Sequence, residues 1–266
     1  MSPAPRESSP SDQRRDDLFL RDDGTAGVVS HRATNARGLH PNTVPALREV
    51  VAEGADWVEM DVQLSADGDL VLHHNVMHEG DEIRHLSTRE IQRRGMATLA
   101  EAANTVPSRV GLFLDVKHSI PDAPGEDEHD LFSTVSAWAD DVSRSRPVAM
   151  VSFCPTLLKP DTSVVSVGVS AHLTTPLYQT LASSALYGSS VAMVHADDIL
   201  SFGDEYTDVD ACVRAIDRFD VAVVAWAVEP ADVPGLLGRG VTGLCGDDVP
   251  ALLAASAKAG PVRRPA

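Results

Sequence analysis

Acidic and histidine side chains gather in one short stretch of the chain, "VEMDVQLSADGDLVLHHN". Glu59 and Asp61 lie one residue apart in an apolar run, and His74 comes near the end of the stretch, after an Asp-Gly pair. Asp115 and Lys117 have the same spacing in "GLFLDVK". Side chains of these types can hold a divalent cation and transfer protons, provided that the fold brings them together.

Strand-like runs recur along the chain and are separated by stretches with helical periodicity. There are eight, at residues 27–32, 57–62, 111–117, 147–153, 164–170, 191–197, 221–228 and 242–247. Helical patterns lie at residues 42–54, 87–94, 98–103, 128–143, 209–219 and 232–240. Eight parallel strands alternating with helices form a closed (β/α)8 barrel, which holds about 250 residues in one domain. The predicted fold class is therefore α/β, a TIM barrel.

The barrel domain is predicted to span residues 27–257, without a second domain or an internal repeat. The lead-in of residues 1–26 begins "MSPAPRESSPSDQRRDD", which is rich in proline, serine and charge. Such a composition predicts disorder. Residues 258–266 are predicted to form a flexible tail for the same reason.

One strand-like run, "LVLHHN", is additional to the eight. It cannot be the next parallel strand, because a parallel crossover takes a dozen or more residues. Asp67 and Gly68 form the strongest short signal for a hairpin turn. We therefore predict a short β-hairpin extension after the second strand, with "LVLHHN" antiparallel to it. This arrangement returns His74 to the rim of the barrel where Asp61 lies.

The alternation of side chains along a strand predicts which of them face into the barrel. In the second strand Val58, Met60 and Val62 must face the helices, so Glu59 and Asp61 face inward. Asp115 and Lys117 of the third strand face inward by the same argument, and the first strand ends on "SHR". These polar groups all lie at the carboxyl ends of strands, which is the catalytic end of a TIM barrel.

A cation is required at this end of the barrel. Glu59, Asp61 and Asp115 would lie close together, and like charges in a partly buried site raise one another's pKa. One divalent cation resolves the repulsion, and oxygen ligands favour Mg²⁺ or Ca²⁺. His31 and His74 are then candidates for a general acid and base. Their surroundings of fixed positive charge suit a phosphodiester that undergoes in-line displacement.

Simpler interpretations exist for each of these residues alone. A single Glu-x-Asp motif also occurs at solvated strand edges, and a single histidine is more often structural than catalytic. Three strand ends that carry inward acids or histidines in register favour a functional site.

The composition excludes several classes of function. A formal net charge of −17 argues against nucleic acid and against stable association with an anionic membrane. No apolar run approaches the roughly 20 residues that cross a membrane, and the N-terminus lacks the apolar segment of a secretory signal. Three scattered cysteines make no disulfide framework, so a reducing cytoplasm is expected. The oligomeric state cannot be inferred from these features.

The residues quoted above also resemble a known family. The segment "SHRATNARGLHPNTVPALREVVAEGADWVEMDVQLSADGDLVLHHN" is similar to the N-terminal signature of the glycerophosphodiester phosphodiesterase family, and "LDVKH", "VSF", "WAVE" and "GVTGLCGDDVP" follow in the family's order. The resemblance implies an eight-stranded β/α barrel. It implies catalytic roles for His31 and His74, metal ligation by Glu59, Asp61 and Asp115, phosphate contacts from Arg32 and Lys117, and a place in the pocket wall for Trp226.

The sequence departs from the family pattern at several positions. Ala33 replaces the glycine after His-Arg, and His40 and Pro41 stand where the family has Pro-Glu. Asn75 replaces an aspartate, and Asp115 replaces the usual glutamate. An aspartate at this last position is similar to the sphingomyelinase D branch of the superfamily, so these departures affect the substrate more than the chemistry.

The predicted function is a metal-dependent phosphodiesterase, a phosphoric diester hydrolase. It would cleave a glycerophosphodiester or a similar small diester to an alcohol and a phosphomonoester. One alternative is a lyase of the phospholipase D type that acts on a phospholipid head group, as sphingomyelinase D does. Another is a barrel that binds a phosphodiester without turnover. Turnover at saturating metal separates the enzyme from the binding protein.

Overall fold

The structure is a computed structural model that describes residues 17–35, 37–117, 126–154, 166–170, 177–201 and 209–264, without the side chains of residues 126–130 and 166–170. Within these ranges the larger sheet has nine strands in the order β1-β11-β10-β9-β8-β7-β6-β2-β3, and β1 also pairs with β2. The pairing of β1 with both β11 and β2 closes eight parallel strands into a barrel. The predicted TIM barrel is confirmed.

The barrel strands follow the predicted runs, and each begins and ends within two residues of its prediction. They are β1 (Gly27–Ser30), β2 (Trp57–Leu64), β6 (Gly111–Val116), β7 (Val148–Ser152), β8 (Ser166–Ser170), β9 (Val191–His195), β10 (Ala222–Trp226) and β11 (Gly243–Gly246). The extension after β2 contains β3 (Leu70–Leu72), β4 (Met77–His78), β5 (Asp81–Glu82) and the short helix η4 (Ile83–His85).

The helices are α1 (Val44–Glu53), α2 (Thr88–Arg93), α3 (Leu99–Thr105), α4 (Glu126–Val142), α5 (Leu177–Leu186), α6 (Ala196–Leu200), α7 (Val209–Phe219), α8 (Val233–Gly238) and α9 (Val249–Ala259), with a short η3 (His31–Ala33). The predicted patterns correspond to α1, α2, α3, α4, α7 and α8. They do not include α5, α6 or α9. The sequence of α9, "VPALLAASAKA", is almost entirely apolar and small, so it lacks the polar face that marks an amphipathic helix.

Local capping explains where the helix before the acidic strand begins and ends. Thr43 precedes α1 and its side chain accepts a hydrogen bond from the backbone N–H of Ala46. Pro45 lies in the first turn, and Gly54 ends the helix in the left-handed conformation, with φ of 98°. These are the signals that favour a helix start and stop.

The predicted hairpin extension is confirmed. β3 runs antiparallel to the end of β2, with Val62 opposite Leu72 and Leu64 opposite Leu70. Gly68 in the connecting turn has φ of 83°, a conformation that glycine adopts without strain. The hairpin brings the segment after β3 back to the carboxyl end of β2, where the backbone N–H of His73 donates to the carbonyl of Asp61 over 3.0 Å.

The two faces of the barrel strands pack into two separate apolar clusters. Val58, Met60 and Val62 are fully buried in the layer between strands and helices. Trp57 and Phe113 lie in a second cluster inside the barrel. The alternation predicted for β2 is therefore the alternation observed, and it directs the odd-numbered side chains inward.

The amino-terminal end of the barrel is closed by a residue from the predicted lead-in. Phe19 is 1% exposed, and its ring centroid lies 4.6 Å from that of Trp57 and 5.5 Å from that of Phe113. Gly27 admits this segment, because a Cβ there would lie 2.3 Å from the Phe19 carbonyl oxygen. The prediction of disorder for residues 1–26 is therefore wrong for the part from residue 17 onward, since composition does not reveal one aromatic plug. Residues 1–16 lie outside the described chain.

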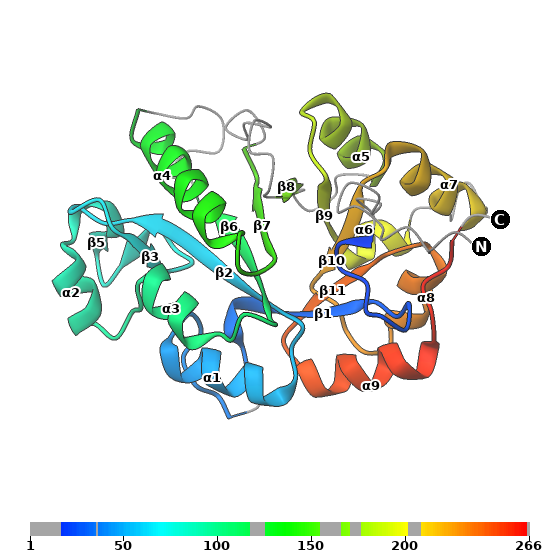
Figure 1. Cartoon of the computed structure of the whole chain (residues 1–266), viewed down its shortest axis with the longest axis horizontal. Coiled ribbons are helices and arrows are strands. Elements are labelled where there is room, and N and C mark those ends of the chain that lie inside the picture. The colour runs from blue at the N-terminus through cyan, green and yellow to red at the C-terminus, as the bar shows by residue number, and fades with distance from the viewer. Residues whose placement is uncertain are drawn as a thin grey trace, which may run out of the picture.

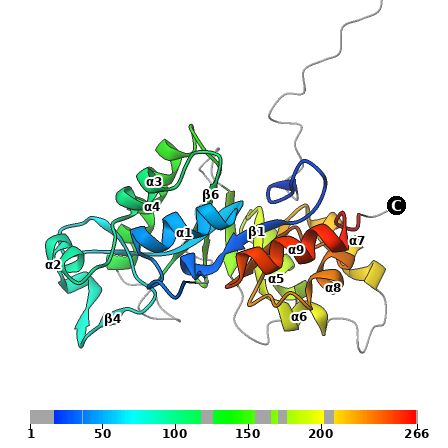
Figure 2. The same ribbon diagram turned by 90° about the horizontal axis from the view of Figure 1, so that it is seen from below.

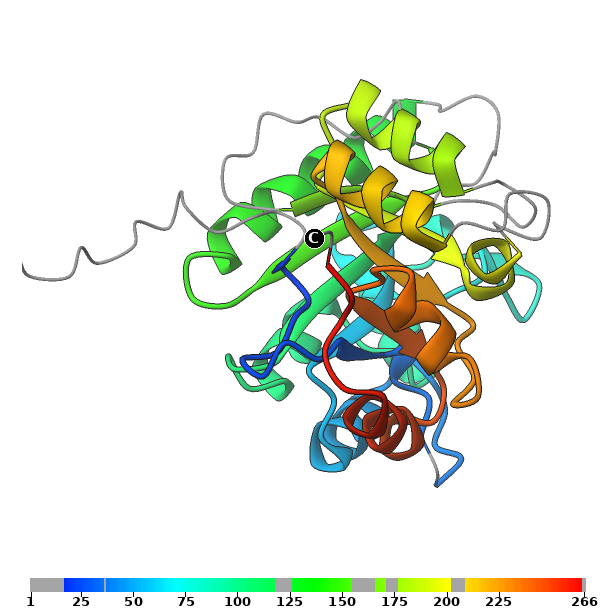
Figure 3. The ribbon, with the colours of Figure 1, turned by 90° about the vertical axis from the view of Figure 1, so that its right-hand side faces the viewer.

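The predicted tail also packs on the barrel. Val262 is 6% exposed, and its backbone N–H donates to the carbonyl of Gly24 over 2.9 Å. The Arg264 guanidinium pairs with the Asp17 carboxylate. Figure 3 shows this red C-terminal segment beside the blue N-terminal one. These contacts hold the chain in place up to residue 264. The predicted flexible tail, which begins at residue 258, is therefore too long.

The helices surround the strands, and the hairpin extension projects to one side (Figure 1). Neighbouring helices contact one another in the pairs α1 with α3, α1 with α9, α8 with α9, and α5 with α7. Figure 2 shows α1 and α9 side by side beneath β1. Within the described chain, no helix has the length and hydropathy needed to cross a membrane.

Candidate functional site

Three carboxylates lie together at the carboxyl ends of β2 and β6. Asp61 and Asp115 face each other in the register of the two parallel strands, and Glu59 precedes Asp61 on the same face. One carboxylate oxygen from each residue lies within 4.8 Å of those of the other two. The residues are 2%, 0% and 5% exposed for Glu59, Asp61 and Asp115. The inward cluster predicted from alternation is therefore present.

Two cationic side chains lie against these carboxylates. The Lys117 ammonium is 2.7 Å from Asp61 Oδ1 and also bonds to Asp115 Oδ2. The Arg32 Nε is 3.5 Å from Asp61 Oδ2, and the Arg32 backbone N–H donates to Glu59 Oε2 over 2.7 Å. The structure thus brings all five predicted ligands and phosphate-binding residues into one cluster.

Burial and mutual repulsion set the charge states of the cluster. Burial raises the pKa of Glu59 well above its ordinary value, and the charges of Asp61 and Asp115 raise it further. Burial alone would also raise the pKa of Asp61, but the Lys117 ammonium and the Arg32 guanidinium hold it below its ordinary value. The same carboxylates raise the pKa of Lys117 against the opposing effect of burial. Asp61 and Lys117 are therefore a stable ion pair, while Glu59 is the acid whose neutral, protonated form the surroundings favour.

The donor set fits a hard divalent cation. All three side chains offer oxygen, which Mg²⁺ and Ca²⁺ prefer. Three carboxylates exceed the two cationic side chains around them, and Asp115 Oδ1 is buried with no hydrogen-bond partner among the described residues. A buried carboxylate oxygen without a partner is costly, and a bound cation would satisfy it.

A strained turn positions Arg32, the arginine that is predicted to contact the phosphate. Arg32 and Ala33 have φ of 54° and 56°, and Asn42 has φ of 58°. Such left-handed conformations are uncommon for residues other than glycine and gather at functional sites. The Asn42 side chain donates to Asp61 Oδ2 over 2.7 Å, and its backbone N–H donates to the Arg32 carbonyl over 2.7 Å. Asn42, the first residue of the helical pattern predicted at residues 42–54, therefore connects the turn to the carboxylate cluster.

His31 is paired with a carboxylate that the sequence analysis did not single out. Its Nδ1 lies 2.8 Å from Asp247 Oδ1, just beyond the end of β11. The hydrogen bond from His31 lowers the pKa of Asp247. An ionised carboxylate only accepts hydrogen bonds, so Nδ1 of His31 carries the proton and Nε2 is left to a ligand. Asp247 follows a strand end, as the other site residues do, and that position could have identified it.

His74 is bonded to a neutral partner instead. Its Nδ1 donates to Asn75 Oδ1 over 2.8 Å. Burial lowers the pKa of His74, while the nearby Asp61 charge opposes the shift. The two histidines thus differ in their partners, a carboxylate for His31 and an amide for His74.

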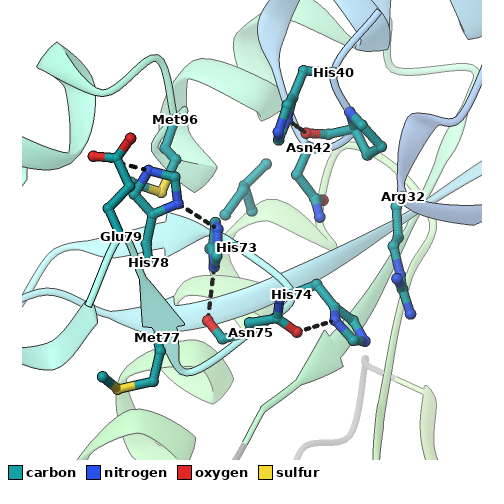
Figure 4. Close-up of a pocket in the computed structure, with 12 residues that line it drawn as sticks. Arg32, His40, Asn42, His73, His74, Asn75, Met77, His78, Glu79 and Met96 are labelled. Carbon is teal, nitrogen blue, oxygen red and sulfur yellow. Dashed lines mark hydrogen bonds and ion pairs between the residues drawn. The ribbon is translucent and has the colours of Figure 1, made fainter. Parts of the chain in front are cut away.

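A cavity of about 380 Å³ opens beside His74 and Arg32. Figure 4 shows these two residues at one end and His78, Glu79 and Met96 at the other. The remaining lining includes His40, Asn42 and His73. We call it the imidazole cavity, after the histidines His40, His73, His74 and His78 that line it.

Trp226 lies at the end of β10, with its ring centroid 4.4 Å from that of His195 in an edge-to-face contact. Its indole Nε1 is buried and has no hydrogen-bond partner among the described residues. Trp226 packs against the cluster inside the barrel and is not among the residues that line the imidazole cavity. Its place in a pocket wall stays a prediction.

Comparison with known proteins identifies the family. The profile of the Glycerophosphoryl diester phosphodiesterase family matches residues 31–251, which include every predicted site residue. The chain belongs to this family. The predicted family and its enzyme class, phosphoric diester hydrolase, are confirmed.

Relatives of this phosphodiesterase share its fold across most of the chain. A glycerophosphodiester phosphodiesterase from Thermotoga maritima is 18% identical, with a TM-score of 0.68, over 86% of this chain and 97% of that one. A protein from Silicibacter pomeroyi described as a glycerophosphoryl diester phosphodiesterase is also 18% identical, with a TM-score of 0.71, over 91% and 96%. A phosphodiesterase from Oleispira antarctica, solved with the product sn-glycerol-3-phosphate, is 19% identical, with a TM-score of 0.66, over 88% and 97%. These likenesses show the fold.

One curated relative matches over a short segment only. The glycerophosphodiester phosphodiesterase GDPD6 of Arabidopsis thaliana is 42% identical over 48 residues, which is 18% of this chain and 13% of that protein. The chain therefore covers a small part of that relative.

One buried amide holds the loop that carries His74 in this phosphodiesterase. Gln63, 7% exposed, lies two residues after Asp61 on β2. Its Nε2 donates to the carbonyl of His73 over 2.5 Å and to that of Asn75 over 2.8 Å. These two residues flank His74, so the amide fixes the backbone on both sides of it.

We expect Gln63→Leu to lower kcat about threefold to tenfold with little change in KM, since each lost hydrogen bond is worth ~1 kcal/mol. Gln63→Glu has the same shape but replaces the donor with an acceptor, so it should do at least as much harm. Steady-state kinetics checks both, with Gln92→Leu on α2 as the control for loss of an exposed glutamine that bonds to Glu101. If the Gln63 and Gln92 variants lower kcat equally, the hydrogen bonds of Gln63 do not position His74.

Proposed function

We propose that the protein is a metal-dependent phosphodiesterase that hydrolyses a glycerophosphodiester or a similar small phosphodiester. The observation that carries the proposal is the carboxylate cluster with His31 and Arg32 on the strand end beside it and His74 on the returning hairpin. Membership of the family supports it, and so does the product bound to the relative from Oleispira antarctica.

Glu59, Asp61 and Asp115 would hold the cation, which would neutralise negative charge on the phosphate. The Arg32 guanidinium and the Lys117 ammonium would contact the phosphate oxygens and orient the diester for in-line attack. Mg²⁺ and Ca²⁺ both suit the donor set.

The two histidines would transfer the protons. His31 Nε2 is suited to accept a proton from the attacking water, because Asp247 stabilises the imidazolium that forms. His74 would donate a proton to the oxygen of the departing alcohol as the phosphorus–oxygen bond breaks. Asp61 and the bound phosphate, both negative, favour the protonated form of His74 during this step. The products are an alcohol and a phosphomonoester.

The direct test is phosphorus NMR of the reaction with sn-glycero-3-phosphoglycerol, with added Mg²⁺ or Ca²⁺ and with EDTA. We expect a phosphomonoester signal that appears only with the cation. A cyclic phosphate as the first and persistent product would instead favour the lyase, in which a substrate hydroxyl displaces the alcohol. No turnover at saturating cation would favour a barrel that binds without catalysis.

The location of the protein is also a proposal. All three cysteines lie in the described chain, are buried and form no disulfide. This supports the expected reducing compartment, the cytoplasm.

A further inference from the structure

We propose that the imidazole cavity binds the alcohol group of the phosphodiester through its hydroxyls and favours a polyhydroxy alcohol over a quaternary ammonium alcohol. The proposal rests on the function proposed above. The cavity adjoins His74 and Arg32, so an alcohol attached to a phosphate in the site would extend into it.

Hydrogen bonds within the cavity determine which ring nitrogen of each imidazole donates and which accepts. His73 Nδ1 donates to the Asn75 carbonyl over 2.7 Å. With both rings neutral, His73 Nε2 then accepts from His78 Nδ1, which lies 3.2 Å away. This leaves His78 Nε2 as an acceptor. The nearest carboxylate oxygen, on Glu79, is 4.0 Å from that nitrogen, which is too far for a hydrogen bond.

A second acceptor lies on the other side of the cavity. His40 Nδ1 donates to the carbonyl of Pro41 over 3.0 Å, which leaves Nε2 of this exposed ring as an acceptor. Figure 4 shows His40 on the side of Asn42 and Arg32, across from His78. Two acceptors on facing walls are matched by hydroxyl groups, which donate hydrogen bonds.

A trimethylammonium group finds no comparable partner here. Proteins recognise such groups with the rings of tryptophan, tyrosine or phenylalanine, and none of these three residue types occurs among the described residues that line the cavity. Glu79 is the carboxylate in the lining, but its side chain is 71% exposed and Arg94 lies 4.0 Å from the same oxygen. Leu72, Met77 and Met96 also line the cavity and can pack against the carbon skeleton of a polyol.

The test measures binding of three monoesters to the cation-loaded protein by calorimetry: glycerol 3-phosphate, inositol 1-phosphate and phosphocholine. These probes need no turnover and carry one alcohol each, so the alcohol alone differs. We expect at least one polyol phosphate to bind about tenfold more tightly than phosphocholine, as one or two added hydrogen bonds imply. Equal or tighter binding of phosphocholine would overturn the proposal, and so would no binding of any of the three.

A matched pair of variants assigns the preference to the cavity. His78→Asn places an amide near the position of Nδ1, so the bond to His73 is kept and only the far nitrogen is lost. It should reduce the polyol preference by about threefold to tenfold. His85→Asn changes a 66% exposed histidine outside the cavity and should leave the preference unchanged. A preference that survives in His78→Asn would overturn the role of the cavity.

Turnover separates this inference from the proposed function. Binding that favours the polyols without hydrolysis of any diester would overturn the proposed function and leave the inference standing. Hydrolysis that proceeds equally well with glycerophosphocholine and glycerophosphoinositol, with no difference in binding, would overturn the inference and leave the function standing.

Discussion

Replacing His31 or His74 with alanine is expected to lower kcat for phosphodiester hydrolysis by about 10²–10⁴-fold, the usual contribution of a general acid or base. His31 leaves Nε2 to a ligand because Nδ1 is bonded to Asp247, and His74 does the same through Asn75. Each substitution removes the imidazole that would transfer the proton. Steady-state kinetics at saturating cation measures both effects.

Substitutions of the residues that bond to the two histidines test the same roles. Asp247→Asn keeps the hydrogen bond to His31 but removes the charge that stabilises its imidazolium, so kcat should fall by about tenfold or more. Asn75→Asp should raise the pKa of His74 and move the pH dependence of kcat upward. His85→Ala, at an exposed histidine, is the control and should retain full activity. Activity within twofold of wild type for His31→Ala would refute the proposed acid–base pair.

The barrel and its inward acids could be predicted because local rules decide them. Strand alternation alone places Glu59, Asp61 and Asp115 inside, since the opposite face must pack on helices. The Asp-Gly turn returns the hairpin and therefore His74. Each of these steps depends on neighbours in sequence, and the structure agrees with all of them.

Contacts between distant segments could not be predicted in the same way. Asp247 and His31 are 216 residues apart, and only barrel closure through β11 brings them together. Phe19 fills the end of the barrel from a segment whose composition indicates disorder. The bond between His73 and His78 depends on how a short loop folds back. Sequence spacing carries no information about these pairs, because tertiary packing alone creates them.

Removal of divalent cations is the second change with a large expected effect. EDTA should abolish turnover, and Mg²⁺ or Ca²⁺ should restore it. A cation at about 100 times its Kd adds ~2.7 kcal/mol to the stability of a protein that binds it only when folded. For a chain of this size that is a rise in Tm of about 5–10 °C. Differential scanning fluorimetry with and without the cation measures this rise.

Glu59→Gln separates a metal ligand from a structural acid. The amide oxygen can still accept the backbone N–H of Arg32, while the carboxyl whose ionisation burial and the charges of Asp61 and Asp115 oppose is gone. Without the cation the variant should therefore be at least as stable as wild type. With the cation it should lose most of the rise in Tm and at least about 10² in kcat, because one ligand and its charge are missing. Asp220→Asn, at an exposed site where asparagine tolerates the left-handed backbone, should change neither. A Glu59→Gln variant that keeps the full rise in Tm would show that the carboxylate cluster is not the cation site.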